Sequence, residues 1–499
     1  MPKPEFKSDS SVKRILKNSL FVALRFAVYA LSGFLFIPFL VNHYGAGSYG
    51  LIALAGFLTQ YVGMISGSVG SSVARFLNIA LNKNDWQQAN EIFSTAMVAN
   101  IAFILLQLPL FALGVWKLDW IISFSPEVAT DFRILVICNI TVFFISMLTG
   151  VLQTPIEASN RLDIGAKIDV IRLTLRLILL VSLILWIGPN LWIIGAVDVV
   201  LSLLNAGVMY KVYRNLAVHL VFKKAYITKK WIRPVLSMSG WSLLIILGFS
   251  LFLKTDVWLI NRFITPELAG IYAAFLLFPN FIKQVAGQFS GLISPVYLID
   301  YSKGNLERVA EVCSFAYKVV FVFGVFSACT IALFSQEIIE ILFPLYIDHA
   351  YILNALMFAS TISVLGDVLR PLFKAYNRMH LMGFVYIVTG FLNLLLSFFF
   401  IKLGLGVFGI ILGTGISLFI RDLICSTLLA TNLINKGNFY LLKNTLIGFC
   451  IAGLFISSQL LFDSTPLSSF ILIFSGIYIL VNEKKMILMG YQFIKKREI

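Results

Sequence analysis

Three cations of this chain lie inside apolar stretches, and they are the residues best suited to bind a ligand. Arg25, Lys254 and Lys283 each interrupt a run of apolar residues long enough to cross a bilayer. A lysine at the middle of a membrane costs about 2.5–3.5 kcal/mol unless it reaches water or a partner, so these residues favour a hydrated cavity. Lysine binds phosphate as a point charge and arginine as a fork. We predict a site for an anion, above all a phosphate or diphosphate; for Arg25 the alternative is snorkelling to the nearer membrane surface.

Polar residues share helix faces with these cations. Asn280, Lys283 and Gly287 recur at helical spacing, and Gln60 begins an equivalent stripe of small residues earlier in the chain. Such stripes also arise where helices pack closely, which is the alternative. The embedded lysine favours the cavity. The residues predicted to line it are Tyr29, Gln60, Asn280 and Gln284.

Acidic residues are few in the apolar stretches. Asp256 follows Lys254 by two residues and projects in another direction, so the two are not natural ion partners. Asp198 is instead the predicted neighbour of Lys254. On the first, seventh and eighth predicted helices we count three embedded cations, Arg25, Lys254 and Lys283, against one acid. The candidates for ion coupling or charge pairing are Asp198 and Asp256.

Basic residues near the predicted cytoplasmic helix ends form another group. Two similar tetrapeptides, Ala158–Arg161 and Ala375–Arg378, end in arginine. Asp367 with Arg370, and Arg421 with Asp422, are close in sequence, and we predict that they form structural or gating pairs. The candidates for a cytoplasmic gate are Arg161, Arg378 and Arg421.

The elements that must position these residues are membrane helices. The chain has 499 residues, of which 59% are hydrophobic and 13% charged. A span needs roughly 20 apolar residues. We predict an all-α polytopic membrane protein with about fourteen spans, centred near residues 30, 60, 103, 143, 178, 202, 249, 281, 322, 360, 391, 418, 449 and 475.

The chain also repeats itself. Tyr49–Ser94 aligns without a gap on Ala269–Ser314, so that Gly50 matches Gly270 and Glu91 matches Glu311. An even number of spans in each copy makes the repeats parallel, as in transporters whose two lobes rock around a site. We predict a transporter with a first lobe (1–214), a basic cytoplasmic linker (215–233), a second lobe (234–433) and two further spans with a basic tail (434–499).

Charge sets the predicted orientation. The net charge is +15, and most of the 39 Lys and Arg residues fall beside segments that are cytoplasmic if both termini are inside. The basic segment from Lys211 to Arg233 suits anionic lipid, and we expect no nucleic acid. The five cysteines and four histidines are scattered, so we predict no metal site and no cofactor. The sequence has no Walker A, G-x-S-x-G or H-E-x-x-H motif, and we predict that the protein is not an enzyme.

Four segments carry a resemblance to a known family. They are K-R-I-L-K-N-S-L (Lys13–Leu20), I-P-F-L-V-N-H-Y-G-A-G-S-Y-G (Ile37–Gly50), S-V-A-R-F (Ser72–Phe76) and N-K-N-D-W-Q-Q-A-N (Asn82–Asn90). With them the chain resembles the polysaccharide-exporter branch of the multidrug/oligosaccharidyl-lipid/polysaccharide (MOP) flippase superfamily. More narrowly, it resembles the O-antigen flippases (Wzx type), over almost its whole length.

The resemblance implies two six-helix lobes around a cationic cavity in a bacterial inner membrane. It implies an oligosaccharide on undecaprenyl diphosphate as cargo, moved from the cytoplasmic to the outer leaflet by alternating access that an ion gradient or the membrane potential drives. Membrane lipid and a polysaccharide polymerase are the partners it allows. Arg25 matches arginines that related lipid II flippases carry in their first helix, whereas Lys254 and Lys283 stand where arginine would be expected. We expect the diphosphate to bind Arg25 and Lys283.

Three other functions stay open at this point. A multidrug exporter of the same superfamily usually needs a buried carboxylate, for which Asp198 and Asp256 are the candidates. A lipid II flippase differs in cargo and not in chemistry. A membrane glycosyltransferase, polymerase or ligase needs a large catalytic loop, and the short predicted outer loops argue against one.

Overall fold

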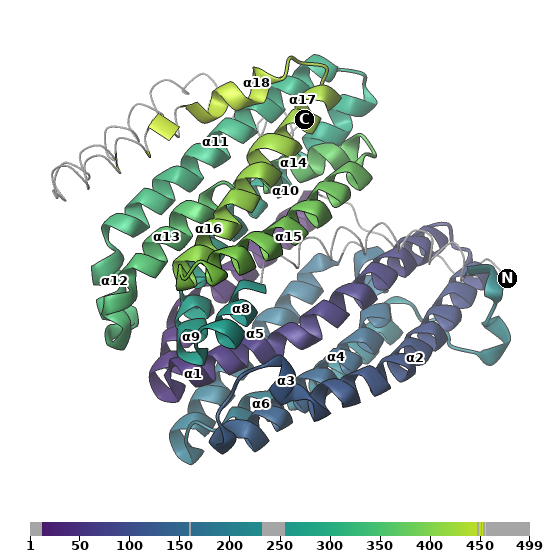
Figure 1. Ribbon diagram of the computed structural model, residues 1–499. Helices are drawn as coiled ribbons and strands as arrows, with labels where there is room; N and C mark the ends of the chain where they lie inside the picture. The colour runs from purple at the N-terminus through teal and green to yellow at the C-terminus, as the bar shows by residue number, and fades with distance from the viewer. Residues whose placement is uncertain are drawn as a thin grey trace. The chain divides into compact units, whose positions relative to one another are not determined.

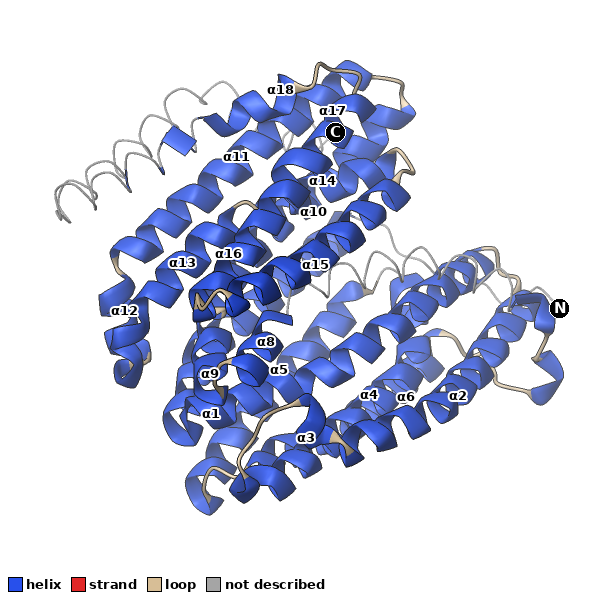
Figure 2. Cartoon of the chain, in the orientation of Figure 1, coloured by secondary structure: helices blue, strands red, loops and turns tan. Residues whose placement is uncertain are grey.

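The computed structural model describes residues 12–158, 161–231 and 255–446, together with Phe449, Cys450, Ala452 and Phe455. Within these ranges the chain is helical and contains no strand, which confirms the all-α prediction (Figure 2). The chain forms two compact units, Met1–Ala274 and Phe275–Ile499, and each is described by itself (Figure 1). The predicted lobe boundaries around the basic linker stay a prediction, because these units are defined by contacts and not by the sequence repeat.

The first unit is built from long apolar helices. The longest, α1 (Val12–Asn82), contains a break at Gly45, whose φ of 75° and ψ of 160° are not helical. Glycine adopts this backbone conformation easily because it has no Cβ. The other helices are α2 (Trp86–Trp116), α3 (Leu118–Ile121), α4 (Ala129–Ala158), α5 (Leu162–Ile187), α6 (Leu191–Leu216), α8 (Thr255–Phe263) and α9 (Pro266–Phe275), with 3₁₀ turns η1 (Pro126–Val128), η2 (Lys224–Tyr226) and η3 (Lys229–Trp231).

In this unit α4 packs against α6 and α1, and α5 packs against α1. The basic segment after α6 lies on α2, where the backbone N–H of Val221 donates to Asn90 (2.7 Å) and that of Thr228 to Thr95 (3.1 Å). The described part of the predicted linker, up to Trp231, therefore packs on α2 of the first unit.

The second unit has the same kind of core. Its helices are α10 (Leu277–Ser302), α11 (Leu306–Leu333), α12 (Ser335–Leu342), α13 (Ala350–Thr361), α14 (Val364–Ala375), α15 (Met379–Lys402), α16 (Gly406–Leu418), α17 (Thr427–Leu433) and α18 (Phe439–Leu442). A π-helix, η5 (Phe419–Ser426), joins α16 to α17, and 3₁₀ turns η4 (Pro344–His349) and η6 (Lys443–Thr445) complete the unit. α14 packs against α10, and α15 packs against α16.

Ten helical segments in the described part of the chain are long and apolar enough to cross a membrane. Each contains one of the predicted span centres. The centre near residue 60 falls in the second part of α1, those near 249 and 475 lie outside the described residues, and the segment around 449 is described only in part. The protein is thus a multi-pass membrane protein, and the count of about fourteen stays a prediction.

The sequence repeat is visible in the backbone. Asn84 and Gly304 are equivalent in the alignment, and both have a positive φ (54° and 72°). The residues that follow them, Asp85 and Asn305, each cap the next helix, with a side-chain oxygen accepting from Gln88 N and Arg308 N respectively. Two turns 220 residues apart therefore have the same construction.

One pair of equivalent residues lies in direct contact. A Cβ built on Gly50 would lie 2.9 Å from the backbone N of Gly270, and a Cβ on Gly270 would lie 1.7 Å from the carbonyl oxygen of Ala46. Glycine is therefore required where α9 crosses α1. This close crossing joins α9 to the first unit, although its sequence belongs to the second repeat.

Candidate functional site

Two arginines share one carboxylate where α1 and α5 of the first unit pack together. Arg25 Nη1 lies 3.1 Å from Asp169 Oδ2, and Arg172 Nη2 lies 3.5 Å from Asp169 Oδ1. The side chains are 39% exposed for Arg25, 29% for Asp169 and 38% for Arg172. All three residues belong to apolar spans, 24–56 and 163–187. Positive charge inside these spans is therefore open to a ligand.

A second ion pair follows on the same face of α5. Asp169, Arg172 and Arg176 stand at i, i+3 and i+7, which places them in one line along the helix. Arg176 binds Asp198 of α6 with a fork, Nε to Oδ1 at 2.5 Å and Nη2 to Oδ2 at 2.9 Å. We call Arg25, Asp169, Arg172, Arg176 and Asp198 the first charge cluster; it has three positive and two negative groups.

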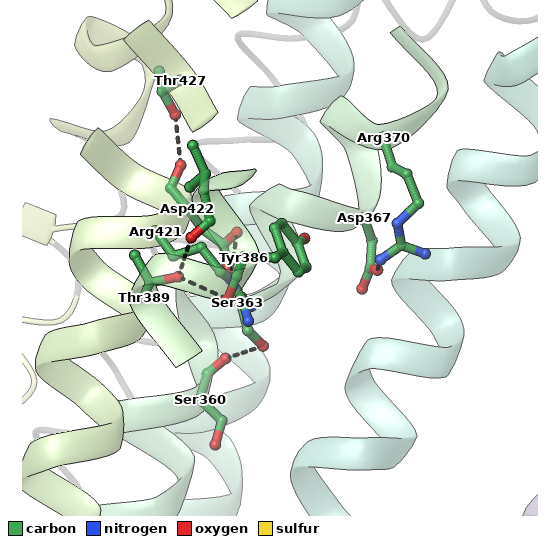
Figure 3. A network of polar contacts seen from close by, with 10 residues as sticks. Ser360, Ser363, Asp367, Arg370, Tyr386, Thr389, Arg421, Asp422 and Thr427 are labelled. Carbon is green, nitrogen blue, oxygen red and sulfur yellow. Dashed lines mark hydrogen bonds and ion pairs between the residues drawn. The ribbon is translucent and has the colours of Figure 1, made fainter. Parts of the chain in front are cut away.

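The second unit holds one ion pair that is fully enclosed by protein. Arg421 and Asp422 are neighbours in the π-helix η5, and Arg421 donates to Asp422 through Nε (3.1 Å) and Nη2 (2.6 Å). Their side chains are 1% and 0% exposed. The ring of Tyr386 from α15 lies against the guanidinium, with its centroid 4.4 Å from Arg421 Cζ (Figure 3). A π-helical turn that carries a buried ion pair within a membrane span is a feature often found at functional sites.

Glycine and threonine complete the surroundings of this pair. A Cβ on Gly366 of α14 would lie 2.6 Å from Asp422 Oδ1 and 2.7 Å from the Tyr386 hydroxyl, so only glycine leaves room here. The Thr427 hydroxyl donates to the backbone carbonyl of Asp422 (2.8 Å) and lies 2.8 Å from the Tyr317 hydroxyl. The altered backbone of η5 is thus satisfied by side chains.

A further ion pair lies on α14. Arg370 donates to Asp367 at 2.6 Å, and Ser290 of α10 donates to the Asp367 carbonyl at 2.5 Å. Lys283, two turns before Ser290 on α10, is partly buried, and the charges of both ion pairs act on it. We call Lys283, Asp367, Arg370, Arg421 and Asp422 the second charge cluster. It too has three positive and two negative groups.

The predicted site residues differ in their exposure, and some lie outside the part of the chain that the structure describes. Arg25 and Tyr29 lie on α1, with Tyr29 four residues after Arg25 and exposed. Gln284 of α10 is exposed and Asn280 is partly buried. Lys254 lies outside the described residues, and so does the side chain of Gln60.

The predicted acids have partners that the sequence analysis did not foresee. Asp198 accepts from Arg176, and Asp256 is buried and accepts from the Tyr272 hydroxyl at 2.7 Å. The two pairs predicted on α14 and η5 do form. Of the gate candidates, Arg161 pairs with Asp163 at 3.3 Å, Arg378 is exposed, and Arg421 is fully buried.

Two embedded arginines were missed in the sequence analysis. Arg172 and Arg176 lie within the apolar span 163–187, a helix that was not included in the count of embedded charges. A signal was present: Asp169, Arg172 and Arg176 recur on one face of an otherwise apolar helix. The polar faces considered from the sequence were those of other helices, and this one was left out.

Comparison with known proteins places the fold. No family model matches the chain. An uncharacterized membrane protein, EpsK of Bacillus subtilis (strain 168), is 23% identical over 462 residues, which is 88% of each chain.

Solved structures resemble the chain over most of its length. The lipid II flippase MurJ, in an inward closed conformation, matches with a TM-score of 0.68 at 14% identity, covering 94% of this chain and 99% of its own. An inward-facing multidrug resistance transporter of the MATE family matches with a TM-score of 0.64 at 14% identity, covering 85% and 99%. This chain therefore has the fold of MOP-superfamily transporters. Those neighbours are transporters and flippases, not enzymes.

Proposed function

We propose that this protein is a flippase that moves an oligosaccharide linked to undecaprenyl diphosphate from the cytoplasmic to the outer leaflet of a bacterial inner membrane. The observation that carries the proposal is Arg25, a guanidinium that lies within a membrane span and is nevertheless 39% exposed. An arginine inside a span marks a substrate or ion pathway by default. Its fork of N–H donors matches the oxygen atoms of a phosphate.

The fold supports the same cargo class. A structural neighbour that covers nearly the whole chain is a flippase for lipid II. In the proposed mechanism the diphosphate binds to Arg25, the polyprenyl tail stays in lipid, and the sugars contact polar side chains such as Tyr29. Lys254, Lys283, Gln60, Asn280 and Gln284 stay predicted contacts along the path, Asp198 and Asp256 stay candidates for ion coupling, and Arg161, Arg378 and Arg421 for a gate.

The membrane potential favours outward movement of an anionic cargo. In a cell that is negative inside, outward movement of an anion is downhill by about 2.3 kcal/mol per charge per 100 mV. The membrane potential or an ion gradient could therefore drive alternating access without a nucleotide. A polysaccharide polymerase on the outer face would then consume the cargo.

A genetic experiment tests the proposed function. The gene is deleted, surface polysaccharide is stained, and lipid-linked oligosaccharide is assayed in the inner leaflet. Lost surface polymer with repeat units trapped inside supports a polysaccharide flippase, whereas loss of cell-wall synthesis points to lipid II. Normal polysaccharide with altered sensitivity to cationic drugs points to a multidrug exporter, the function of the MATE-type neighbours.

Complementation then tests the residues. We expect Arg25→Gln to abolish rescue at normal protein level, and Arg133→Gln, an exposed arginine of α4, to rescue fully. Lys283→Ala is tested in parallel: full rescue would remove Lys283 from the pathway.

A further inference from the structure

We infer that Arg172 binds the phosphate together with Arg25, and that Asp169 is a built-in competitor that occupies both arginines when no phosphate is present. This inference rests on the proposed function and deepens it. It adds a binding residue on α5 and gives the shared carboxylate a role in release.

The geometry of the shared carboxylate is the first step. Asp169 accepts from Arg25 at 3.1 Å and from Arg172 at 3.5 Å, so each guanidinium spends one of its five N–H donors on it. Neither contact is the two-bond fork that arginine forms with a carboxylate at its best. Both side chains keep more than a third of their surface exposed. A ligand can therefore reach donors that are already held side by side.

The next arginine of the same helix forms a complete two-bond ion pair with its own carboxylate. Arg176, one turn after Arg172, has both bonds of its fork on Asp198, at 2.5 and 2.9 Å. That pair is neutral and its donors are committed to its own carboxylate. Arg25, Arg172 and Asp169 together instead keep one net positive charge. The contrast is local, because both arginines lie on one face of α5 and within one span.

Charge and geometry together select a phosphate. Two guanidinium groups that converge on one point offer two forks to a group with several oxygen atoms. A diphosphate has more such oxygen atoms than a monophosphate. The ligand's second negative charge also balances the arginine that Asp169 leaves uncompensated. A diphosphate should therefore displace Asp169 more effectively than a monophosphate does.

The competitor explains how cargo could leave. Two free arginines would hold a diphosphate too tightly for turnover, because both could form two-bond forks with it. Asp169 offers both arginines an alternative partner of the same geometry. Binding is then an exchange of one anion for another, and its free energy is the difference between the two.

The experiment uses the full chain in nanodiscs of zwitterionic lipid, with undecaprenyl diphosphate, undecaprenyl monophosphate and inorganic diphosphate as probes. For undecaprenyl diphosphate we expect Arg172→Gln to weaken binding at least tenfold, as Arg25→Gln does. Arg176→Gln, the matched control, should change the affinity less than threefold. Asp169→Asn should tighten binding several-fold, an effect that a purely structural carboxylate would not have.

A conservative variant and a competing ligand test the inference further. If Arg172→Gln folds poorly, Arg172→Lys keeps the charge and loses the fork, and we expect an intermediate affinity. Wild-type affinity in a well-folded Arg172 variant, or weaker binding in Asp169→Asn, would overturn the inference. Inorganic diphosphate that competes equally well with the lipid would assign the site to free diphosphate. Loss of binding in both variants without any flipping by the wild type would instead refute the proposed function and leave the phosphate site standing.

Discussion

One part of each charge cluster differs clearly in its surroundings: the group Arg25, Asp169 and Arg172 of the first, and the pair Arg421 and Asp422 of the second. The arginines that share Asp169 are more than one-third exposed, as is Arg370 of the second cluster, whereas Arg421 and Asp422 are almost completely buried. A pair open to solvent contributes little to stability, and losing one partner of a buried pair costs much more. We therefore assign binding to Arg25, Asp169 and Arg172, and architecture to the buried pair of the second cluster.

Removal of Asp422 should have the largest effect on stability and tests whether the buried pair is structural. Asp422→Ala leaves the buried Arg421 guanidinium without that carboxylate, and we expect the free energy of unfolding to fall by about 3–5 kcal/mol. Unfolding in mixed detergent micelles measures it, with protein level in the membrane as a second readout. A change below about 1 kcal/mol would place the pair with ordinary exposed ion pairs.

Gly366→Ala tests the packing around the same pair. The new Cβ would collide with Asp422 Oδ1 and the Tyr386 hydroxyl, and overpacking of this kind costs about 1–3 kcal/mol. The control is Gly287→Ala on α10, where a Cβ meets no atom within 4 Å. Equal stability of the two variants would show that the pair can shift to make room.

Transport activity should depend more on Arg25 than on Arg421, the reverse of the order expected for stability. We expect Arg25→Gln to reduce flipping at least tenfold, which corresponds to about 1.4 kcal/mol, while the protein level stays normal. Arg421→Gln should lower the amount of folded protein instead. Flipping per folded molecule, measured for both variants, checks this, and equal loss per molecule in Arg421→Gln would bring the second cluster into the transport path.

The smallest expected effect is on the stability of the first cluster. Asp169→Asn should change the free energy of unfolding by less than about 1 kcal/mol, because the carboxylate and both arginines are partly exposed. The same unfolding assay applies. A loss as large as that of Asp422→Ala would mean that Asp169 is a structural residue and that the two clusters do not differ in role.

Local features of both clusters were predictable from the sequence. The ion pairs of the second cluster join residues one and three positions apart, and both form as predicted. The repeat alignment brings Asn84 onto Gly304, and the structure has a positive φ at both. By contrast, Arg25 and Asp169 are 144 residues apart in the chain, and no spacing rule connects them.

The amino-acid pattern determined that this is an all-helical membrane protein with a duplicated plan and cations within its spans, because apolar length and helical periodicity are properties of local sequence. Tertiary structure decided which of these charges are available to a ligand. Asp169 is shared by Arg25 and Arg172 because α5 packs on α1, and Arg421 is enclosed because Gly366 leaves room for Asp422 and Tyr386. Exposure depends on neighbours brought from distant parts of the chain, and the same residue types are therefore open at Asp169 and enclosed at Asp422.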